Sequence, residues 1–291
     1  MKRCAYLTMQ DPGDFVTDYD VSFAAMTARG WQVDTVAWRD ASLQWDDYDA
    51  VYICTPWDYT QHQAQFLSVL QAIEDSSAVL VNPLPLVHWT LVKTYLRDLQ
   101  QRGADIVPSL WYDDFDAAEI SGWFTALGTD KAIIKPAVGV NAQDTYVLQD
   151  PVPASLVAHL GSTFHDRAFF VQPFIDNIQI EGEFSLFYFG GEYSHAILKV
   201  PKAGEFRVQE EHGGDIQSVQ PPAALLATGQ RLMSMVEPQP VYVRADFVRG
   251  ADGRFLLMEL ELIEPSLYLR MDAGAADRFA TAFDHYYEEH A

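Results

Sequence analysis

The chain has 291 residues, 49% of them hydrophobic, and its 41 acidic and 19 basic residues give a net charge of −22. This length predicts two or three structural units with a sizeable core, and the negative charge argues against nucleic acids and anionic membranes as partners. No apolar run is long enough to span a bilayer or resembles a signal peptide. Because both cysteines fall in strands expected to be buried, we expect a reducing, cytoplasmic location.

Residues 1–87 alternate predicted strands with predicted helices. The strands are expected at residues 3–8, 31–38, 50–55 and 78–82, and the helices at residues 21–29 and 62–74. This alternation predicts an α/β domain with a doubly wound parallel sheet, in which ligands bind beyond the carboxyl ends of the strands. Because no GxGxxG motif follows the first strand, a dinucleotide site is not expected.

Two polar loops follow strands of this predicted sheet. Residues 8–14 come after the first strand, and residues 55–59, with the sequence TPWDY, come after the third. Their position and residue types suggest substrate contact, whereas plain loop packing is the alternative. Four side chains are therefore predicted to contact a substrate: Thr8, Trp57, Asp58 and Arg270.

The segment NPLP at residues 82–85 marks a domain boundary, and a second unit is expected over residues 88–171. Lys93 lies on its first predicted helix, and Lys135 lies inside the apolar strand sequence IIKP, where a buried ammonium is costly without an anion. A lysine that protects an edge strand from aggregation is the alternative for Lys135. The predicted elements of this unit are helices at 89–102 and 115–127 and strands at 106–111, 131–136 and 145–148.

A third unit is expected over residues 172–291. A strand at 169–175 leads into this unit. It continues with a hairpin of strands 183–189 and 192–200, a polar loop, a helix at 222–236, a second hairpin and a helix at 273–289. Four of the chain's six lysines fall in or beside the segments named so far: Lys93, Lys135, Lys199 and Lys202. In so acidic a chain, this local positive cluster indicates an anionic ligand.

The second hairpin, residues 241–263, places three carboxylates and an arginine on one face. If Asp252-Gly253 forms its turn, Asp246 lies opposite Glu259 and Arg244 lies opposite Glu261. Opposed like charges destabilise a sheet, so the pattern predicts a bound cation, and hard oxygen ligands suit Mg²⁺. The alternative is a solvated outer face whose negative charge is offset by Arg244.

In chain order these features resemble the ATP-grasp superfamily, in its branch of glutathione-synthetase-like and ribosomal-protein-S6-modifying ligases. The resemblance covers the whole chain and implies an N-terminal doubly wound domain followed by a two-lobed α+β ATP-binding domain. It implies an ATP site formed by Lys93, Lys135, Gly139, the hinge residues Gln172, Pro173, Phe174 and Ile175, and Glu183 at the ribose. It also implies the Mg²⁺ ligands Asp246, Glu259 and Glu261 and the catalytic cations Lys199 and Arg207, and Arg244 is expected beside Glu261 or a substrate phosphate.

Two departures from the family pattern concern this site. The loop at residues 139–144, GVNAQD, has one glycine where the family loop is glycine-rich, so fewer backbone N–H groups are expected to cradle phosphate. Glu261 stands where the family commonly has asparagine. A third carboxylate binds Mg²⁺ more strongly but makes the site more negative for a triphosphate, an excess that Arg244 could offset.

The resemblance implies a reaction in which a small-molecule carboxylate attacks the γ-phosphate of ATP, giving an acyl phosphate and ADP. An amine then displaces phosphate to form an amide-type bond, with one or two Mg²⁺ ions, or Mn²⁺ in their place. The chain also resembles the ligases that close O-ureidoserine to D-cycloserine, through residues 56–59, 181–185 and 259–265. A small-molecule kinase and a non-catalytic nucleotide-binding regulator are the alternatives. The substrates, intra- or intermolecular ligation and a homodimeric state stay open.

Overall fold

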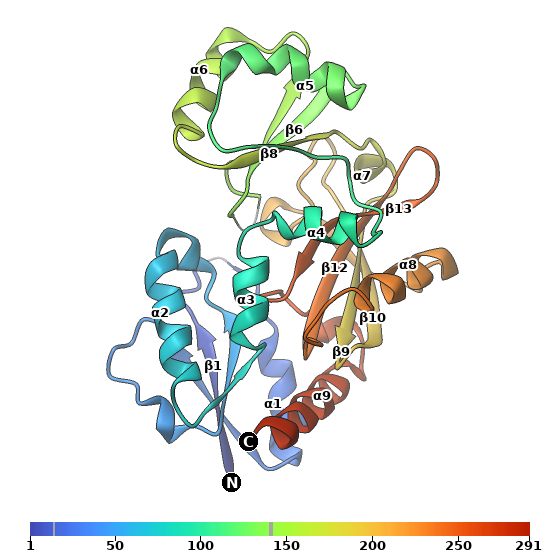
Figure 1. Cartoon of the computed structure of the whole chain (residues 1–291). Helices are drawn as coiled ribbons and strands as arrows, with labels where there is room; N and C mark the ends of the chain where they lie inside the picture. Colours follow the sequence, from blue (N-terminus) through green and yellow to red (C-terminus); the bar gives the residue numbers. More distant parts are fainter. Residues whose placement is uncertain (14, 140–141) are drawn as a thin grey trace.

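Three β-sheets, each packed with helices, form three lobes of the molecule (Figure 1). The computed structural model describes residues 1–13, 15–139 and 142–291. The N-terminal lobe contains strands β1–β4, the small lobe contains β5–β8, and the large lobe contains β9–β13. Within these described residues, no helix combines the length and apolar character needed to cross a membrane.

The N-terminal lobe is a parallel sheet with the strand order β2-β1-β3-β4, which confirms the predicted α/β class. Alternate residues of β1 belong to different cores: Cys4 and Tyr6 pack into one, and Ala5 and Leu7 into the other. Both faces of the sheet are therefore covered, as parallel sheets require. The elements are β1 (Lys2–Thr8), α1 (Phe23–Ala28), β2 (Trp31–Ala37), β3 (Ala50–Thr55), α2 (Gln63–Glu74) and β4 (Val79–Val81).

The small lobe is an antiparallel sheet with the strand order β5-β8-β6-β7, covered by two helices. Gly128, with φ of 63°, ends α5 in the left-handed conformation that glycine adopts without strain. The expected boundary between residues 171 and 172 falls inside β8, whose end leads to the large lobe. The elements are β5 (Leu110–Tyr112), α5 (Ile120–Leu127), β6 (Lys131–Pro136), β7 (Tyr146–Gln149), α6 (Ala154–Thr163) and β8 (Phe169–Pro173).

The large lobe is an antiparallel sheet with the strand order β11-β10-β9-β12-β13. Strand β9 lies at its centre and is buried along its whole length, which suits the apolar and aromatic sequence EFSLFYF. The elements are α7 (Asn177–Ile180), β9 (Glu183–Phe189), β10 (Glu192–Val200), β11 (Asp215–Ser218), α8 (Ala223–Met233), β12 (Tyr242–Arg249), β13 (Phe255–Glu261) and α9 (Ala275–His290).

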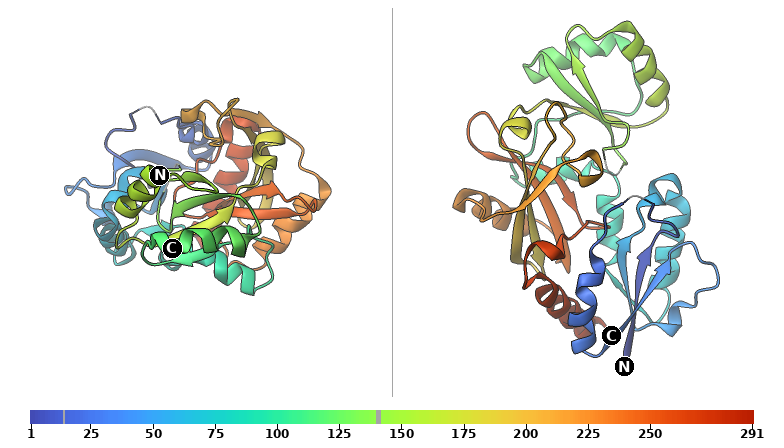
Figure 2. Two further views of the ribbon diagram at one scale, coloured as in Figure 1. Left: turned by 90° about the horizontal axis from the view of Figure 1, so that it is seen from above. Right: turned by 180° about the vertical axis from the view of Figure 1, so that it is seen from behind.

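Helix α9 joins the large lobe to the N-terminal lobe, and it lies beside α1 in the view from behind (Figure 2). Phe283 of α9 meets Trp31 edge to face with 5.2 Å between ring centroids. Asp284 accepts hydrogen bonds from the Trp31 indole at 3.0 Å and from Lys2 at 2.5 Å. The last helix of the chain therefore completes the core of the first domain.

The single helix predicted at residues 89–102 is wrong. The segment holds the end of α3 (Leu84–Thr90) and the whole of α4 (Tyr95–Gln101), with residues 91–94 between them. The backbone N–H of Lys93 donates to the carbonyl of Ala137 at 2.8 Å, so this hydrogen bond links the break to the small lobe. The helix is therefore interrupted where the chain makes a long-range contact, which the local sequence does not encode.

The strand predicted at residues 106–111 is also shorter than expected, because only residues from Leu110 onward join the small-lobe sheet. Ile106 instead makes an isolated bridge with Leu257 of β13, and the N–H of Val107 donates to the Leu257 carbonyl at 3.0 Å. This segment therefore connects the large lobe to the small lobe before it enters β5.

Candidate active site

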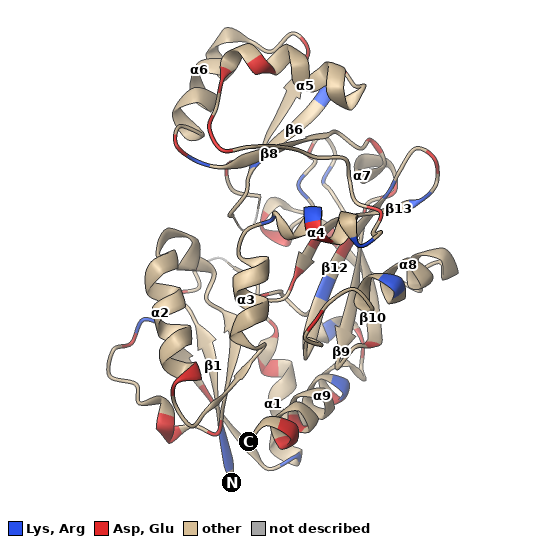
Figure 3. Ribbon diagram, viewed as in Figure 1, with Lys and Arg blue, Asp and Glu red and all other residues tan. Residues whose placement is uncertain are grey.

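A cleft between the small and large lobes, closed on one side by loops of the N-terminal lobe, gathers most of the predicted site residues. Basic and acidic residues occur together along β12, which contributes to this cleft (Figure 3). The predicted residues that line it are Trp57, Lys93, Lys135, Gly139, Gln172, Pro173, Phe174, Ile175, Glu183, Lys199, Arg207, Arg244, Asp246, Glu259 and Glu261. Residues 140 and 141 of the glycine-poor loop lie outside the described residues.

The hairpin of β12 and β13 has the predicted pairing at its charged residues. Arg244 pairs with Glu261, and Asp246 pairs with Glu259. The Arg244 guanidinium donates both to Glu261 and, at 3.1 Å, to Asp246. The four side chains therefore share the face that borders the cleft, as period-two alternation predicts.

The turn of this hairpin differs from the prediction by one residue. Arg249 pairs with Phe255, whereas a turn of Asp252-Gly253 alone would have paired it with Leu256. A bulge at Met258 inserts an extra residue in β13 and restores the predicted register at the carboxylates. Bulges re-aim side chains and are frequent beside active sites. The pairing was thus predicted correctly through two errors that cancel.

Lys199 lies at the centre of a buried charge cluster. Its ammonium is 2.7 Å from Glu183 and 3.3 Å from Asp246, and the Ser185 hydroxyl donates to Asp246 at 2.5 Å. Burial alone would raise the pKa of Asp246, but Arg244 and Lys199 hold it below its usual range. Burial raises the pKa of Glu183 despite Lys199. Buried charges are tolerated when they are paired in this way.

The three predicted metal ligands have cationic partners in place of an ion. Lys93 lies 2.6 Å from Glu259, and Arg244 contacts both Asp246 and Glu261. Burial raises the pKa of Glu261 to about 7. The neighbouring carboxylates contribute to this rise, whereas Arg244 opposes it. Three hard oxygen ligands with an excess of negative charge fit Mg²⁺. Their oxygens are not gathered around one point in the described structure.

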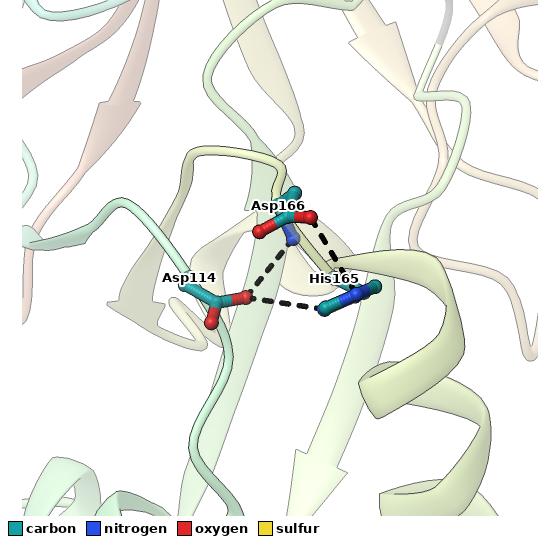
Figure 4. A group of neighbouring side chains, drawn as sticks. All are labelled: Asp114, His165 and Asp166. Carbon is teal, nitrogen blue, oxygen red and sulfur yellow. Dashed lines mark hydrogen bonds and ion pairs between the residues drawn. The ribbon is translucent and has the colours of Figure 1, made fainter.

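A different group does bring three potential ligand atoms together, on the surface of the small lobe. Within the described ranges, Asp114, His165 and Asp166 are the side chains whose ligand atoms lie within 4.8 Å of one another (Figure 4). All three are exposed, and Asp114 also accepts from the backbone N–H of Asp166 at 3.0 Å. These contacts explain the proximity without an ion.

The two predicted nucleotide lysines border the cleft from different elements. Lys93, between α3 and α4, donates to the Gly139 carbonyl at 2.8 Å as well as pairing with Glu259. Lys135 of β6 has its ammonium 5.1 Å from the centre of the Phe170 ring. Burial lowers the pKa of Lys135, and none of the described carboxylates comes within 4 Å of it. A cation placed in this way suits an anionic ligand.

The predicted adenine hinge follows the end of β8. Gln172 is buried, and its side-chain amide donates to the Ser109 hydroxyl at 2.9 Å. The N–H of Phe174 donates to the Lys131 carbonyl at 2.9 Å, and the Lys131 ammonium lies 3.4 Å from the centre of the Phe174 ring. Glu183, predicted at the ribose, is held by Lys199. Hinge and acidic residue therefore line one cleft but have protein partners here.

Arg207 borders the cleft from the loop between β10 and β11. Its guanidinium pairs with Glu205 at 2.5 Å, and hydrogen bonds from Arg207 and from the backbone lower the pKa of Glu205 to about 2. The Arg207 Nε atom is buried without a hydrogen-bond partner among the described atoms. The guanidinium therefore keeps a donor available for a ligand.

Only one of the four side chains predicted to contact substrate lines the cleft. Trp57 does so, and its indole donates to the Glu264 carbonyl at 2.9 Å. Thr8 donates to a backbone carbonyl of β2, Asp58 accepts from Trp38 at 2.6 Å, and Arg270 pairs with Asp18 and Glu210. The structure places these last three outside the cleft lining, where they contact other parts of the protein.

The cleft residues that were not predicted include Phe15, Tyr59 and Glu264. Phe15 and Trp57 pack with 5.0 Å between ring centroids, and Tyr59 follows Trp57 by two residues. Glu264 lies three residues beyond Glu261 and is 8% exposed. The carboxylate next to Pro265, just past the metal-ligand pair, was the sequence signal that could have found Glu264.

Comparisons with known proteins show which families and structures this chain resembles. Residues 4–82 match the family described as D-cycloserine synthetase DcsG, N-terminal domain. Over 282 residues the chain is 30% identical to the cycloserine biosynthesis protein DcsG of Streptomyces lavendulae, covering 91% of this chain and 93% of that protein. The crystal structure of D-cycloserine synthetase DcsG matches with a TM-score of 0.86 at 26% identity, covering 98% of this chain and 99% of that one.

More distant structures share the fold. The ATP-grasp ligase PsnB, complexed with a minimal precursor, Mg and ADP, matches with a TM-score of 0.65 at 14% identity, covering 98% of each chain. A RimK-domain ATP-grasp protein from Sphaerobacter thermophilus matches with a TM-score of 0.67 at 15% identity, covering 97% of this chain and 99% of that one. All three lobes are included in these matches.

Proposed function

The chain belongs to the ATP-grasp ligases, in the family of the cycloserine biosynthesis protein DcsG, and from this membership we propose that it closes O-ureidoserine to cycloserine at the expense of ATP. The substrate carboxylate attacks the γ-phosphate and ADP leaves, and the nitrogen bonded to oxygen in the same molecule then displaces phosphate from the acyl phosphate. The carbamoyl group on this nitrogen, which cycloserine lacks, leaves by hydrolysis as carbon dioxide and ammonia. The family name and the arrangement of charges in the cleft support this reaction. Phosphoryl transfer needs mainly positioning and neutralisation of oxygen charge.

One observation carries the proposal: the lining of a single cleft includes a cluster of four cations and four carboxylates from separate elements. Each carboxylate of this cluster has a cationic partner, so the cluster is preorganised before a ligand binds. The cations are Lys93, Lys199, Arg244 and the less paired Lys135, and the carboxylates are Glu183, Asp246, Glu259 and Glu261. A triphosphate and a metal ion can exchange into such a set without leaving buried charges uncompensated.

We assign the metal position to the carboxylates of Asp246, Glu259 and Glu261. These residues would hold Mg²⁺, which would supply neutralisation of the charge that develops on the phosphate oxygens of ATP. To hold this ion, Glu259 would give up its ion pair with Lys93, and Glu261 would give up its ion pair with Arg244. Both released cations remain in the cleft, where phosphate oxygens take the place of the carboxylates.

The other cleft residues have roles that follow from their positions. The segment from Gln172 to Ile175 offers backbone groups to adenine, and Glu183 is placed for the ribose hydroxyls. Lys135 is placed for the phosphates from β6, and Arg207, on the loop after β10, is placed for the substrate carboxylate. These assignments leave Trp57 as the predicted substrate contact from the N-terminal lobe.

The test is to incubate the protein with O-ureidoserine and ATP, with and without Mg²⁺, and to measure ADP and the cyclic product by mass spectrometry. The proposal predicts that ADP and cyclic product appear together and that both require Mg²⁺. ADP formation with a stable phosphorylated substrate and no ring would identify a small-molecule kinase. No ADP with O-ureidoserine, but ADP with another carboxylate and amine, would overturn the substrate assignment.

A further inference from the structure

Glu264 is a buried carboxyl group on the wall of the cleft that the reaction described so far does not use. It follows β13, is 8% exposed, and lines the cleft. The Trp57 indole donates to its backbone carbonyl at 2.9 Å, and a hydrogen bond from Tyr59 reaches its carboxyl group. Burial raises the pKa of Glu264 to about 8.

Among the described residues, Glu264 differs from the carboxylates on the strands of the cleft because it forms no ion pair with a lysine or arginine. Glu183 and Asp246 contact Lys199, Glu259 contacts Lys93, and Glu261 contacts Arg244. For Glu264, the described side chains include no lysine, arginine or histidine nitrogen within 4 Å. A buried carboxylate without a counter-ion is costly, so its environment favours a cation from a ligand.

The surroundings of Glu264 suit a small cationic group. Phe15, Trp57 and Tyr59 line the same part of the cleft, and the Phe15 and Trp57 rings are 5.0 Å apart. Aromatic faces attract cations, most strongly where water is excluded. Tyr59 is 4% exposed, so little water reaches the carboxyl group from that side.

The distance from the reacting centre limits the size of the ligand. Glu264 is three residues from Glu261, and three residues of extended chain span at most about 10 Å. A molecule whose carboxylate lies at the phosphates therefore needs only a few bonds to reach Glu264 with a cationic group. The α-ammonium of an amino acid meets this requirement.

We propose that Glu264 binds the ammonium group of the substrate and makes the cleft specific for amino acids over carboxylates that lack the amino group. This inference rests on the proposed function, because it takes the substrate carboxylate to lie at the transferred phosphate, and it names the substrate class. Glu264 is a specificity-determining residue: it orients the substrate and takes no part in the phosphoryl transfer.

The test compares two ligands that differ only in the amino group: O-ureidoserine, as each enantiomer, and 3-(ureidooxy)propanoic acid. Their dissociation constants are measured by calorimetry on protein loaded with Mg²⁺ and AMPPNP, so no turnover is required. A charge-assisted hydrogen bond predicts about 10- to 100-fold tighter binding of one enantiomer of the amino compound by the wild type. Glu264→Gln should bring this ratio close to one.

Three controls separate specificity from a general defect. Glu264→Gln should leave the dissociation constants of AMPPNP and of the deaminated ligand within about twofold of wild type. Glu264→Asp, which keeps the charge, should recover part of the ratio. Glu192→Gln makes the same substitution at an exposed position outside the cleft lining and should behave as wild type.

The inference is wrong if Glu264→Gln keeps the wild-type ratio, or if the wild type binds the two ligands equally well or binds neither. Release of ADP from ATP in the presence of O-ureidoserine is measured separately on the same protein preparations, with ATP in place of AMPPNP. Wild-type protein that prefers the amino ligand but releases no ADP would support the role of Glu264 and refute the proposed reaction. Wild-type protein that releases ADP but shows no ligand preference would support the proposed reaction and refute the role of Glu264.

Discussion

Replacing Glu264 by glutamine should change how the stability of the ligand-free protein depends on pH. The pKa of this carboxyl rises from 4.5 to about 8, chiefly because burial disfavours its charged form. Unfolding therefore releases a proton between these two values, and stability falls as the pH rises through that window. At about 1.4 kcal/mol per pH unit, the wild type loses about 5 kcal/mol of unfolding free energy across it.

The charged and titratable groups that face Glu264 set this shift. Glu261 and Glu259 raise its pKa, whereas the hydrogen bond from Tyr59 and the charge of Lys93 lower it. The pKa of Glu261 is itself raised to about 7, so that carboxyl also makes the wild type less stable as the pH rises. The difference between wild type and Glu264→Gln isolates the contribution of Glu264, because Glu261 is present in both.

The assay is urea unfolding of both proteins, without nucleotide or metal, at about pH 5 and about pH 8.5. The proton linkage predicts that Glu264→Gln is more stable than wild type by about 1 kcal/mol at the lower pH and about 5 kcal/mol at the higher one. Glu192→Gln should show no such trend. An equal stability difference at both pH values would refute the burial argument.

Four further substitutions test the other assignments. Asp246→Asn and Glu259→Gln should each reduce ADP formation below detection while circular dichroism stays that of wild type; wild-type rates in both would contradict the metal assignment. Lys199→Met should lower the unfolding free energy by about 3–5 kcal/mol in urea, because Glu183 and Asp246 lose their shared buried counter-ion, and an unchanged midpoint would contradict it. Asp58→Asn should keep the KM of the carboxylate substrate within about twofold of wild type, since its contact is Trp38; a tenfold rise would return Asp58 to the substrate site.

The fold could be predicted where the pattern of the sequence is local. Strands buried on both faces and separated by helices indicated the parallel N-terminal sheet, and the strand predicted at residues 131–136 is β6 itself. The continuous helical pattern at 89–102 failed because Lys93 makes a backbone hydrogen bond to Ala137 in another lobe. The packing of α9 on the first domain is likewise a long-range contact with no local signal.

The site was predicted in its residue types and partly in its geometry. Alternation along two strands was sufficient to place Arg244 and Asp246 opposite two glutamates, and the bulge at Met258 compensated for a misplaced turn. Ion pairing was harder to foresee, because it depends on which distant cations fold against the hairpin. Glu264 was missed for the same reason. The sequence shows that it is charged, but not that it is buried or that the nearby cations pair with other carboxylates.

The central claim is that this ligase activates a carboxylate by phosphorylation, and isotope transfer tests that step directly. O-ureidoserine labelled with ¹⁸O in its carboxyl group is incubated with the protein, Mg²⁺ and unlabelled ATP, and the released phosphate is analysed by mass spectrometry. An acyl phosphate predicts that each phosphate carries one ¹⁸O atom from the carboxylate, because the C–O bond breaks when nitrogen attacks. Unlabelled phosphate formed together with the cyclic product would contradict the claim.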